Sequence, residues 1–211
     1  WRMGIVLIIN HRINTIKELH LLPLGVPVEV DIHAYGDRIV VQHDAMRDGL
    51  DFSDWLDAAG RRFAILNIKE EGIENKVLKM AENSSLDDFF LLDLSFPALI
   101  KMVRSGEKRL ALRVSEYENY NVALKLTNKI GWIWLDCFDG FPLNKSECVG
   151  LVGSGAKICL VSPELHGPHR TQEDILTFKS LLQDYEFPIE AVCTKQPELW
   201  RSFEIKESST V

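Results

Sequence analysis

The 211 residues of the chain, 46% of them hydrophobic and 26% charged, supply ample apolar material for one large domain or two small ones. The formal net charge of −7 and the absence of a Lys/Arg cluster argue against nucleic acid as a partner. No apolar run reaches the roughly 20 residues of a membrane-spanning helix, so we expect no stable insertion into a membrane.

Short apolar runs rich in β-branched and aromatic residues recur along the chain, and amphipathic segments separate them. A turn at residues 35–37 is followed by an expected return strand over Ile39–Val41, and Ser95 and Thr171 are typical of helix starts. We expect strands at eight further runs: Ile5–Asn10, Val28–His33, Phe63–Ile68, Phe89–Leu94, Leu110–Val114, Trp132–Cys137, Lys157–Val161 and Ile189–Cys193.

Eight strand–helix units at this length fit a compact α/β fold, the (β/α)8 TIM barrel. A doubly wound open sheet is the alternative, but it rarely needs eight strands at this length, and no Gly-rich nucleotide loop follows the first strand. Because the sequence has no linker and no break in composition, residues 1–211 are predicted to form a single domain.

The four cysteines show no CxxC spacing, and Cys159 and Cys193 lie inside apolar runs. We interpret them as reduced core residues of a cytoplasmic protein, rather than as disulfides, zinc ligands or nucleophiles. Residues 1–10 lack the sections of a secretion signal, although Trp1 in place of Met leaves a removed leader open. The sequence gives no indication of oligomeric state.

Polar residues stand at the C-terminal end of every predicted strand. In a barrel these ends lie on one face, where enzymes of this fold carry their chemistry. A single terminal Asp has a simpler explanation as a helix cap, but polar residues at eight ends indicate a site. We therefore expect six side chains to open onto one cavity: Glu29, Asp31, Asn67, Asp93, Arg113 and Asp136.

The stretch 26–44 carries the densest chemistry. Glu29 and Asp31 lie on one face of a strand, where two carboxylates can share a hard cation such as Mg²⁺ or Ca²⁺. The alternative is that these two carboxylates pair with Arg12 and Lys69 and bind no metal. His11 and His43 bracket the acids, and imidazole is the side-chain group suited to proton transfer near neutral pH.

Cations near this pair suit the oxygens of a phosphate; the expected substrate-binding residues are Arg12, Lys69 and Arg113. A metal, two imidazoles and cations together favour phosphoryl chemistry. A glycosidase would instead require a carboxylate pair on different strands, spaced across the scissile bond.

Four motifs, in order, resemble the HR, ExD, HD and ExK signatures of glycerophosphodiester phosphodiesterases, in the phospholipase C-like phosphodiesterase superfamily. They are His11-Arg12, Glu29-x-Asp31, His43-Asp44 and Asn67-Ile68-Lys69, and they cover residues 4–70. With its short segments after His11-Arg12 and between His43 and Asn67, the chain also resembles the sphingomyelinase D-like phospholipases of that superfamily. The resemblance implies a small-molecule phosphodiester substrate, a barrel, general acid–base catalysis by His11 and His43, and a divalent cation.

Two departures from the family pattern bear on activity. Asn67 stands where the family has its third metal ligand, a glutamate, and the segment after His11-Arg12 is short. The leading hypothesis is a metal-assisted hydrolase of a glycerophosphodiester or lysophospholipid-like substrate, with the metal on Glu29, Asp31 and Asn67. The alternatives are a lyase of the same superfamily that releases a cyclic phosphate, and a catalytically degenerate barrel that binds a phosphorylated ligand.

Overall fold

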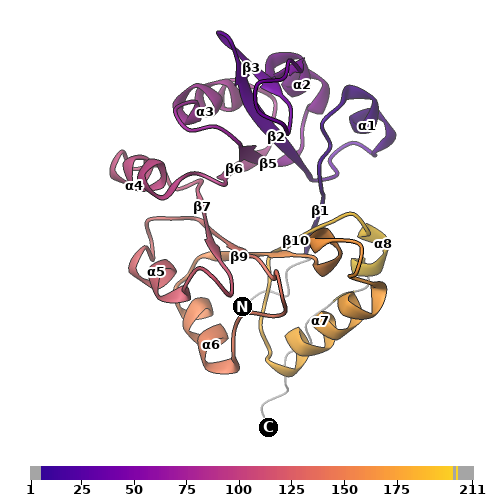
Figure 1. Cartoon of the computed structure of the whole chain (residues 1–211), viewed down its shortest axis with the longest axis vertical. Coiled ribbons are helices and arrows are strands. Elements are labelled where there is room, and N and C mark those ends of the chain that lie inside the picture. The colour runs from indigo at the N-terminus through magenta and orange to yellow at the C-terminus, as the bar shows by residue number, and fades with distance from the viewer. Residues whose placement is uncertain (1–5, 202, 204–211) are drawn as a thin grey trace. The chain divides into compact units, whose positions relative to one another are not determined.

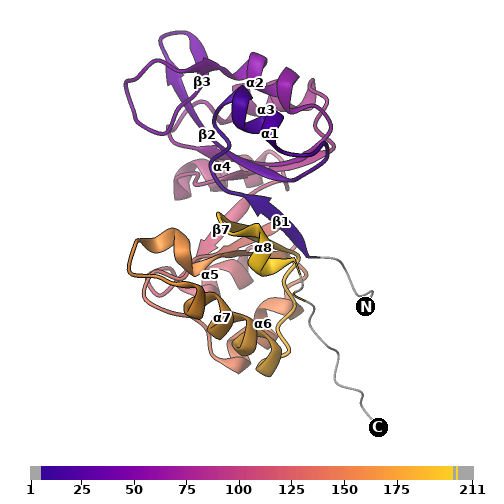
Figure 2. The same cartoon turned by 90° about the vertical axis from the view of Figure 1, so that its right-hand side faces the viewer.

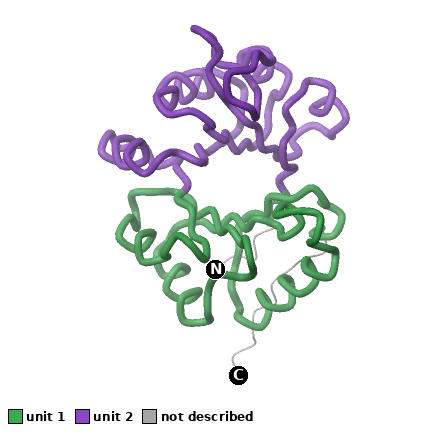
Figure 3. Tube along the Cα trace, viewed as in Figure 1, with its two compact units in different colours: residues 1–8, 112–211 green, residues 9–111 purple. Residues whose placement is uncertain are grey.

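The computed structural model describes residues 6–201 and residue 203. Strands and helices alternate along this part of the chain (Figures 1 and 2). The chain divides into two compact units (Figure 3). Unit 2 is the continuous segment of residues 9–111, and unit 1 combines residues 1–8 with residues 112–211.

The centre of unit 2 is a set of parallel strands. Strand β2 (Val28–Tyr35) pairs with β5 (Phe63–Ile68), which pairs with β6 (Asp88–Leu92). The end of β1 (Leu7–Asn10) joins them where Asn10 lies opposite Val28. The interior of each strand is buried. On β2 one face is apolar, whereas the other carries the buried side chains of Glu29, Asp31 and His33.

The predicted return strand is present as β3 (Arg38–Val41), which runs antiparallel to β2 (Figure 2). Tyr35 pairs with Arg38, so the turn has only two residues, and Gly36 adopts a left-handed φ of 59° that suits glycine. A short strand that the sequence did not indicate, β4 (Leu50–Asp51), pairs with β3.

Three of the four helices of unit 2 begin at residues whose side chains cap the helix. Thr15 forms a capping box with Glu18, and the Ser95 side chain accepts a hydrogen bond from the Ala98 N–H, as expected for the predicted helix start. Pro97 lies in the first turn, where it costs no helical hydrogen bond. The helices are α1 (Ile16–Leu21), α2 (Phe52–Ala59), α3 (Glu74–Glu82) and α4 (Phe96–Arg104).

Unit 1 has its own parallel strands. Strand β8 (Trp132–Leu135) pairs with β9 (Lys157–Val161), and β9 pairs with β10 (Ala191–Thr194). Strand β7 (Ala111–Val114) joins β8 through a hydrogen bond from the Asp136 N–H to the Val114 carbonyl. Helices lie between the strands: α5 (Tyr120–Lys125), α6 (Lys145–Gly153), the 3-10 turn η1 (Pro163–His166) and α7 (Gln172–Asp184). Helix α8 (Pro197–Trp200) follows β10.

All eight predicted runs contain a strand, which confirms the α/β class and the repeated strand–helix order of the barrel. Within the described residues the sheet is not closed, because β6 meets the β7 segment at a single bridge between Leu91 and Leu110. The single-domain assignment stays a prediction beside the two compact units. In the described part of the chain, no helix combines the length and apolar character needed to cross a membrane.

Candidate active site

Glu29 and Asp31 lie two residues apart on one face of β2, and neither exposes any side chain. The neighbouring strand β5 places Asn67 in register with Asp31. Because a buried carboxylate loses its hydration, both acids require hydrogen bonds or nearby cations. The surrounding residues supply both.

Each oxygen of Glu29 accepts a hydrogen bond. The backbone N–H of Arg12 donates to Oε2 over 2.7 Å, and the Asn67 side-chain amide donates to Oε1 over 2.8 Å. His11 Nε2 lies 3.8 Å from Oε2. Burial, followed by repulsion from Asp31, raises the pKa of Glu29 to about 7, although both hydrogen bonds oppose the shift.

The two oxygens of Asp31 have different surroundings. Oδ2 accepts a 2.9 Å hydrogen bond from the Asn14 side-chain amide and lies 3.5 Å from Arg12 Nε. Oδ1 lies 3.4 Å from Lys69 Nζ but accepts no hydrogen bond among the described residues. The carboxylate therefore faces the loop after β1 with one oxygen and the end of β5 with the other.

Lys69 also donates to Asp93 Oδ2 over 3.2 Å, which links the ends of β2, β5 and β6 at one edge of the sheet. Arg12 and Asp93 both adopt left-handed backbone conformations, with φ values of 55° and 60°. Such conformations strain a residue that has a Cβ atom, and they concentrate at functional sites. At Arg12 the conformation accompanies the hydrogen bond from its N–H to Glu29.

A cavity of about 240 Å³ adjoins these strand ends. Of the six side chains predicted to open onto one cavity, Asp93 lines this one. Lys69, which contacts Asp31, also lines it, whereas Glu29 and Asp31 are not among its lining residues. Its full lining is Ile68, Lys69, Glu70, Glu71, Glu74, Asp93, Leu94 and Ser95.

The two predicted catalytic histidines lie in different surroundings. His11 is mostly buried beside Glu29. His43 is exposed in the loop after β3, with Nδ1 3.0 Å from Asp44 Oδ1. This contact lowers the pKa of Asp44 most strongly, and the positive charge of Arg12 contributes a smaller share.

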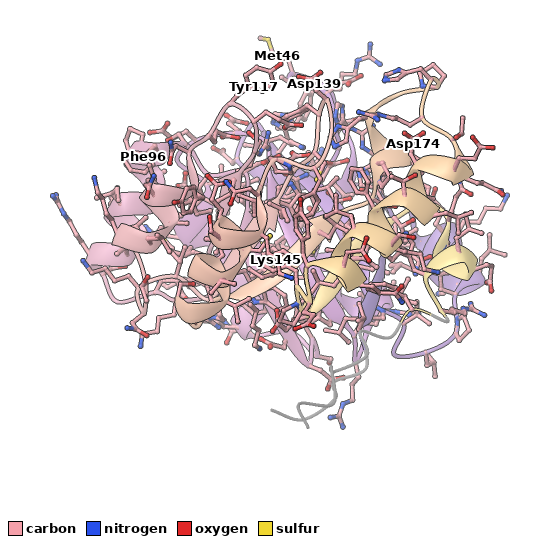
Figure 4. The ribbon with its side chains drawn as sticks, turned by 90° about the horizontal axis from the view of Figure 1, so that it is seen from below. Met46, Phe96, Tyr117, Asp139, Lys145 and Asp174 are labelled. Carbon is pink, nitrogen blue, oxygen red and sulfur yellow. The ribbon has the colours of Figure 1, made fainter. Side chains whose placement is uncertain are left out.

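The predicted substrate residue Arg113 belongs to unit 1, at the end of β7. Its Nε lies 3.6 Å from Asp136 Oδ2 and 3.9 Å from Glu118 Oε2. His166 Nε2 lies 2.7 Å from the other oxygen of Asp136. Nearby, the Tyr117 hydroxyl donates to Asp139 Oδ2 over 2.5 Å, and Figure 4 labels both residues.

The available donor atoms decide whether these residues suit the divalent cation that the motifs imply. Asp31 Oδ1 and Asn67 Oδ1 are buried oxygens that accept no hydrogen bond within the described residues, and they come from registered neighbours on β2 and β5. Oxygen atoms of this kind suit Mg²⁺ or Ca²⁺. Within the described residues, no group of three His, Cys, Asp or Glu side chains could hold a metal ion, so a cation here would depend on the neutral amide of Asn67.

Sequence reasoning brought together residues that the structure also groups: His11, Arg12, Glu29, Asp31, Asn67 and Lys69. It did not foresee the part played by Asn14. The signal available was its position between His11-Arg12 and the helix cap Thr15, but that position alone does not show where the side chain points. The side chain of His166, the partner of Asp136, is largely buried.

Two solved structures share the fold over nearly the whole chain. A provisionally named glycerophosphoryl diester phosphodiesterase from Agrobacterium tumefaciens strain C58 gives a TM-score of 0.65 at 14% identity, covering 93% of this chain and 96% of its own. A glycerophosphodiester phosphodiesterase from the same strain gives 0.56 at 12% identity, covering 94% and 98%. No family model and no curated protein matches the sequence.

Proposed function

We propose that this chain, which has the fold of glycerophosphodiester phosphodiesterases, hydrolyses a phosphodiester of the glycerophosphodiester or lysophospholipid-like class. The observation that carries the proposal is the buried Glu29–Asp31 pair, with Arg12 and Lys69 beside it and His11 against it. Neutral or weakly charged ligands would not need two cations beside buried acids. A phosphodiester, with its anionic oxygens, would use them.

The residues have separate tasks in this proposal. The Arg12 guanidinium and the Lys69 ammonium bind the phosphoryl oxygens and neutralise the charge that develops on them. Asp31 holds both cations at the strand ends before substrate arrives, and Glu29 accepts a hydrogen bond from the backbone N–H of Arg12. From the sequence pattern of polar residues at strand ends, we also propose Arg113 as a substrate contact.

Proton transfer falls to the two histidines. One imidazole accepts the proton of the attacking water or hydroxyl, and the other donates a proton to the leaving alkoxide, so the P–O bond breaks without releasing a strong base. His11 is oriented by Glu29, 3.8 Å from its Nε2, and His43 by Asp44, 3.0 Å from its Nδ1. A carboxylate beside an imidazole stabilises the charged form that proton uptake creates.

Glu29, Asp31 and Asn67 are the residues that would hold a divalent cation, Mg²⁺ or Ca²⁺. Such an ion would neutralise charge on the phosphoryl oxygens and lower the pKa of a bound hydroxyl. With two carboxylates and one neutral amide, the three residues offer less charge than three acids do, so we expect weak binding.

Asn67 and the exposed position of His43 favour one other function: binding of a phosphorylated ligand without turnover. The lyase alternative differs from the hydrolase only in the nucleophile, which would be a hydroxyl of the substrate itself. Location in the cytoplasm stays a prediction.

The deciding experiment is phosphorus NMR of glycerophosphodiesters and lysophospholipids incubated with the protein, with added Mg²⁺ or Ca²⁺ and with chelator. Hydrolysis gives a phosphomonoester and a free alcohol, whereas the lyase gives a cyclic phosphate. Binding of glycerol phosphate without any product would establish the degenerate barrel. If the protein neither turns over nor binds these compounds, the phosphodiesterase proposal is wrong.

A further inference from the structure

Hydrogen bonds fasten the end of β1 and the loop after it to residue 27, to β2 and to α2. The Asn10 N–H donates to the Pro27 carbonyl, the Ile13 N–H donates to the Glu29 carbonyl over 2.8 Å, and the Trp55 indole donates to the Ile13 carbonyl over 2.9 Å. This path places Asn14 directly beside Asp31.

Asn14 holds Asp31 at two points. Its Nδ2 donates to Asp31 Oδ2 over 2.9 Å, and its Oδ1 accepts from the Asp31 backbone N–H over 3.0 Å. A single amide group thus binds both the backbone and the carboxylate of one residue. The carboxylate cannot rotate about its side chain without breaking the first of these bonds.

The consequence concerns the other oxygen of Asp31. With Oδ2 held by Asn14, Oδ1 points toward Lys69, where it lies 3.4 Å from Nζ and accepts no hydrogen bond within the described residues. Asp31 is fully buried, so water does not replace a lost donor easily. Residues that orient a functional carboxylate in this way typically change metal affinity or activity by about 10–100-fold when mutated.

We infer that Asn14 is a positioning residue, which fixes the carboxylate of Asp31. In this orientation Oδ1 pairs with Lys69, which binds the phosphoryl group, and is available to a cation. The inference rests on the proposed function and deepens it, because it adds a residue that does not itself touch the substrate. The inference assigns different roles to the two contacts of Asn14. The hydrogen bond to the Asp31 carboxylate orients that group for function, and the hydrogen bond from the Asp31 backbone N–H stabilises the fold.

Two variants separate these contacts. Asn14→Ala removes both. Asn14→Asp keeps an oxygen that accepts from the Asp31 N–H, but it replaces the donor to Oδ2 with a repelling carboxylate. Asn10→Ala is the matched control, since Asn10 lies in the same segment and its side chain donates only to the Pro27 carbonyl, over 3.3 Å.

The measurements are kcat and KM for the best phosphodiester substrate, calorimetric titration with Mg²⁺ alone, and the thermal midpoint. We expect Asn14→Ala and Asn14→Asp each to lower kcat by about 10-fold or more. Asn14→Asp should also lower the thermal midpoint, because its carboxylate repels buried Asp31, so kcat is compared at a temperature where both variants are folded. Asn10→Ala should keep the wild-type thermal midpoint and kinetics.

Wild-type kcat and Mg²⁺ affinity in Asn14→Asp would overturn the inference while leaving the proposed function intact, because only the backbone contact would then matter. A loss of kcat matched by an equal loss in Asn10→Ala would also overturn it, as it would reflect the loop as a whole. If the wild-type protein neither turns over a phosphodiester nor binds Mg²⁺, the proposed function and the inference both fail.

Discussion

At the scale of single residues, burying the two carboxylates carries a large desolvation free energy. Glu29 and Asp31 are stable as a pair only because Arg12, Asn14, Asn67 and Lys69 supply donors and positive charge. A protein that needed only stability could place apolar residues here, since a buried ion pair rarely stabilises more than its apolar replacement. The arrangement is therefore explained better by chemistry than by folding.

The two histidines give the first prediction. His11→Ala and His43→Ala should each lower phosphodiester turnover by about 10²-fold or more, which is the usual effect of removing a positioned acid or base. The measurement is kcat/KM for each variant, with pH varied across the neutral range.

His20→Ala is the control, because His20 is an exposed residue in the last turn of α1. Wild-type rates in His43→Ala alone would remove that exposed imidazole from the mechanism and leave His11 as the single proton-transfer group.

Asn67 gives the second prediction. Asn67→Glu places a third carboxylate next to Glu29 and Asp31, so divalent cations should bind more tightly, because hard cations gain affinity with ligand charge. Lys69, two residues along β5, can pair with the new acid. The measurement is calorimetric titration with Mg²⁺ and with Ca²⁺.

Asn83→Glu, at the exposed end of α3, introduces the same charge away from the site and should leave the titration unchanged. Equal or weaker binding by Asn67→Glu would mean that residue 67 does not contact the cation.

At the scale of elements, the strands were the most predictable part of the chain. Most are apolar up to a polar residue at their end, whereas β2 alternates apolar residues with Glu29, Asp31 and His33. Both patterns predict the strand together with its candidate site residues. The two-residue strand β4 is too short to leave a pattern. The contacts of Asn14 were not predictable, because they depend on the left-handed turn at Arg12, which the sequence does not mark with a glycine.

Arg62 connects two helices of unit 2, and the sequence does not reveal this role. It exposes only 2% of its surface, and its guanidinium donates to five backbone carbonyls near the ends of α1 and α2: Leu19, Leu22, Pro23, Val26 and Ala59. Burial lowers the pKa of Arg62, although arginine stays charged. The cation takes the place of the missing helix-end hydrogen bonds.

The third prediction follows from these bonds. Arg62→Met should lower the free energy of unfolding by about 2–4 kcal/mol, because several buried carbonyls lose their donor at once. Urea denaturation measures it. Arg61→Met is the neighbouring control, since Arg61 is 84% exposed and pairs only with Asp87 at the surface; it should change stability by less than about 1 kcal/mol. Equal losses in both variants would contradict the role given to Arg62.

At the scale of the whole molecule, the four cysteines report on the integrity of the packed interior. All four are buried, and burial raises the pKa of Cys148 to about 12 and that of Cys137 well above its ordinary value. A thiol reacts with disulfide reagents as its thiolate, so both groups should be inert in the folded protein.

The fourth prediction is therefore that Ellman's reagent labels the native protein slowly and the denatured protein rapidly at four thiols. The time course at neutral pH, with and without guanidinium chloride, is the measurement. Rapid labelling of one thiol without denaturant would show that its element opens readily. Fewer than four thiols after denaturation would contradict the prediction that the cysteines are reduced.

The division of the chain into an uninterrupted unit 2 and a split unit 1 has a consequence for how the protein is made. Every residue of the His11–Lys69 cluster has left the ribosome soon after Ala111 is synthesised, whereas the partner strand β10 of unit 1 begins 80 positions later, at Ala191. At about 5–20 residues per second, this interval lasts on the order of 4–16 s. The phosphoryl-binding residues can therefore assemble on the nascent chain before β10, the strand that pairs with the first residues of β1, has been synthesised.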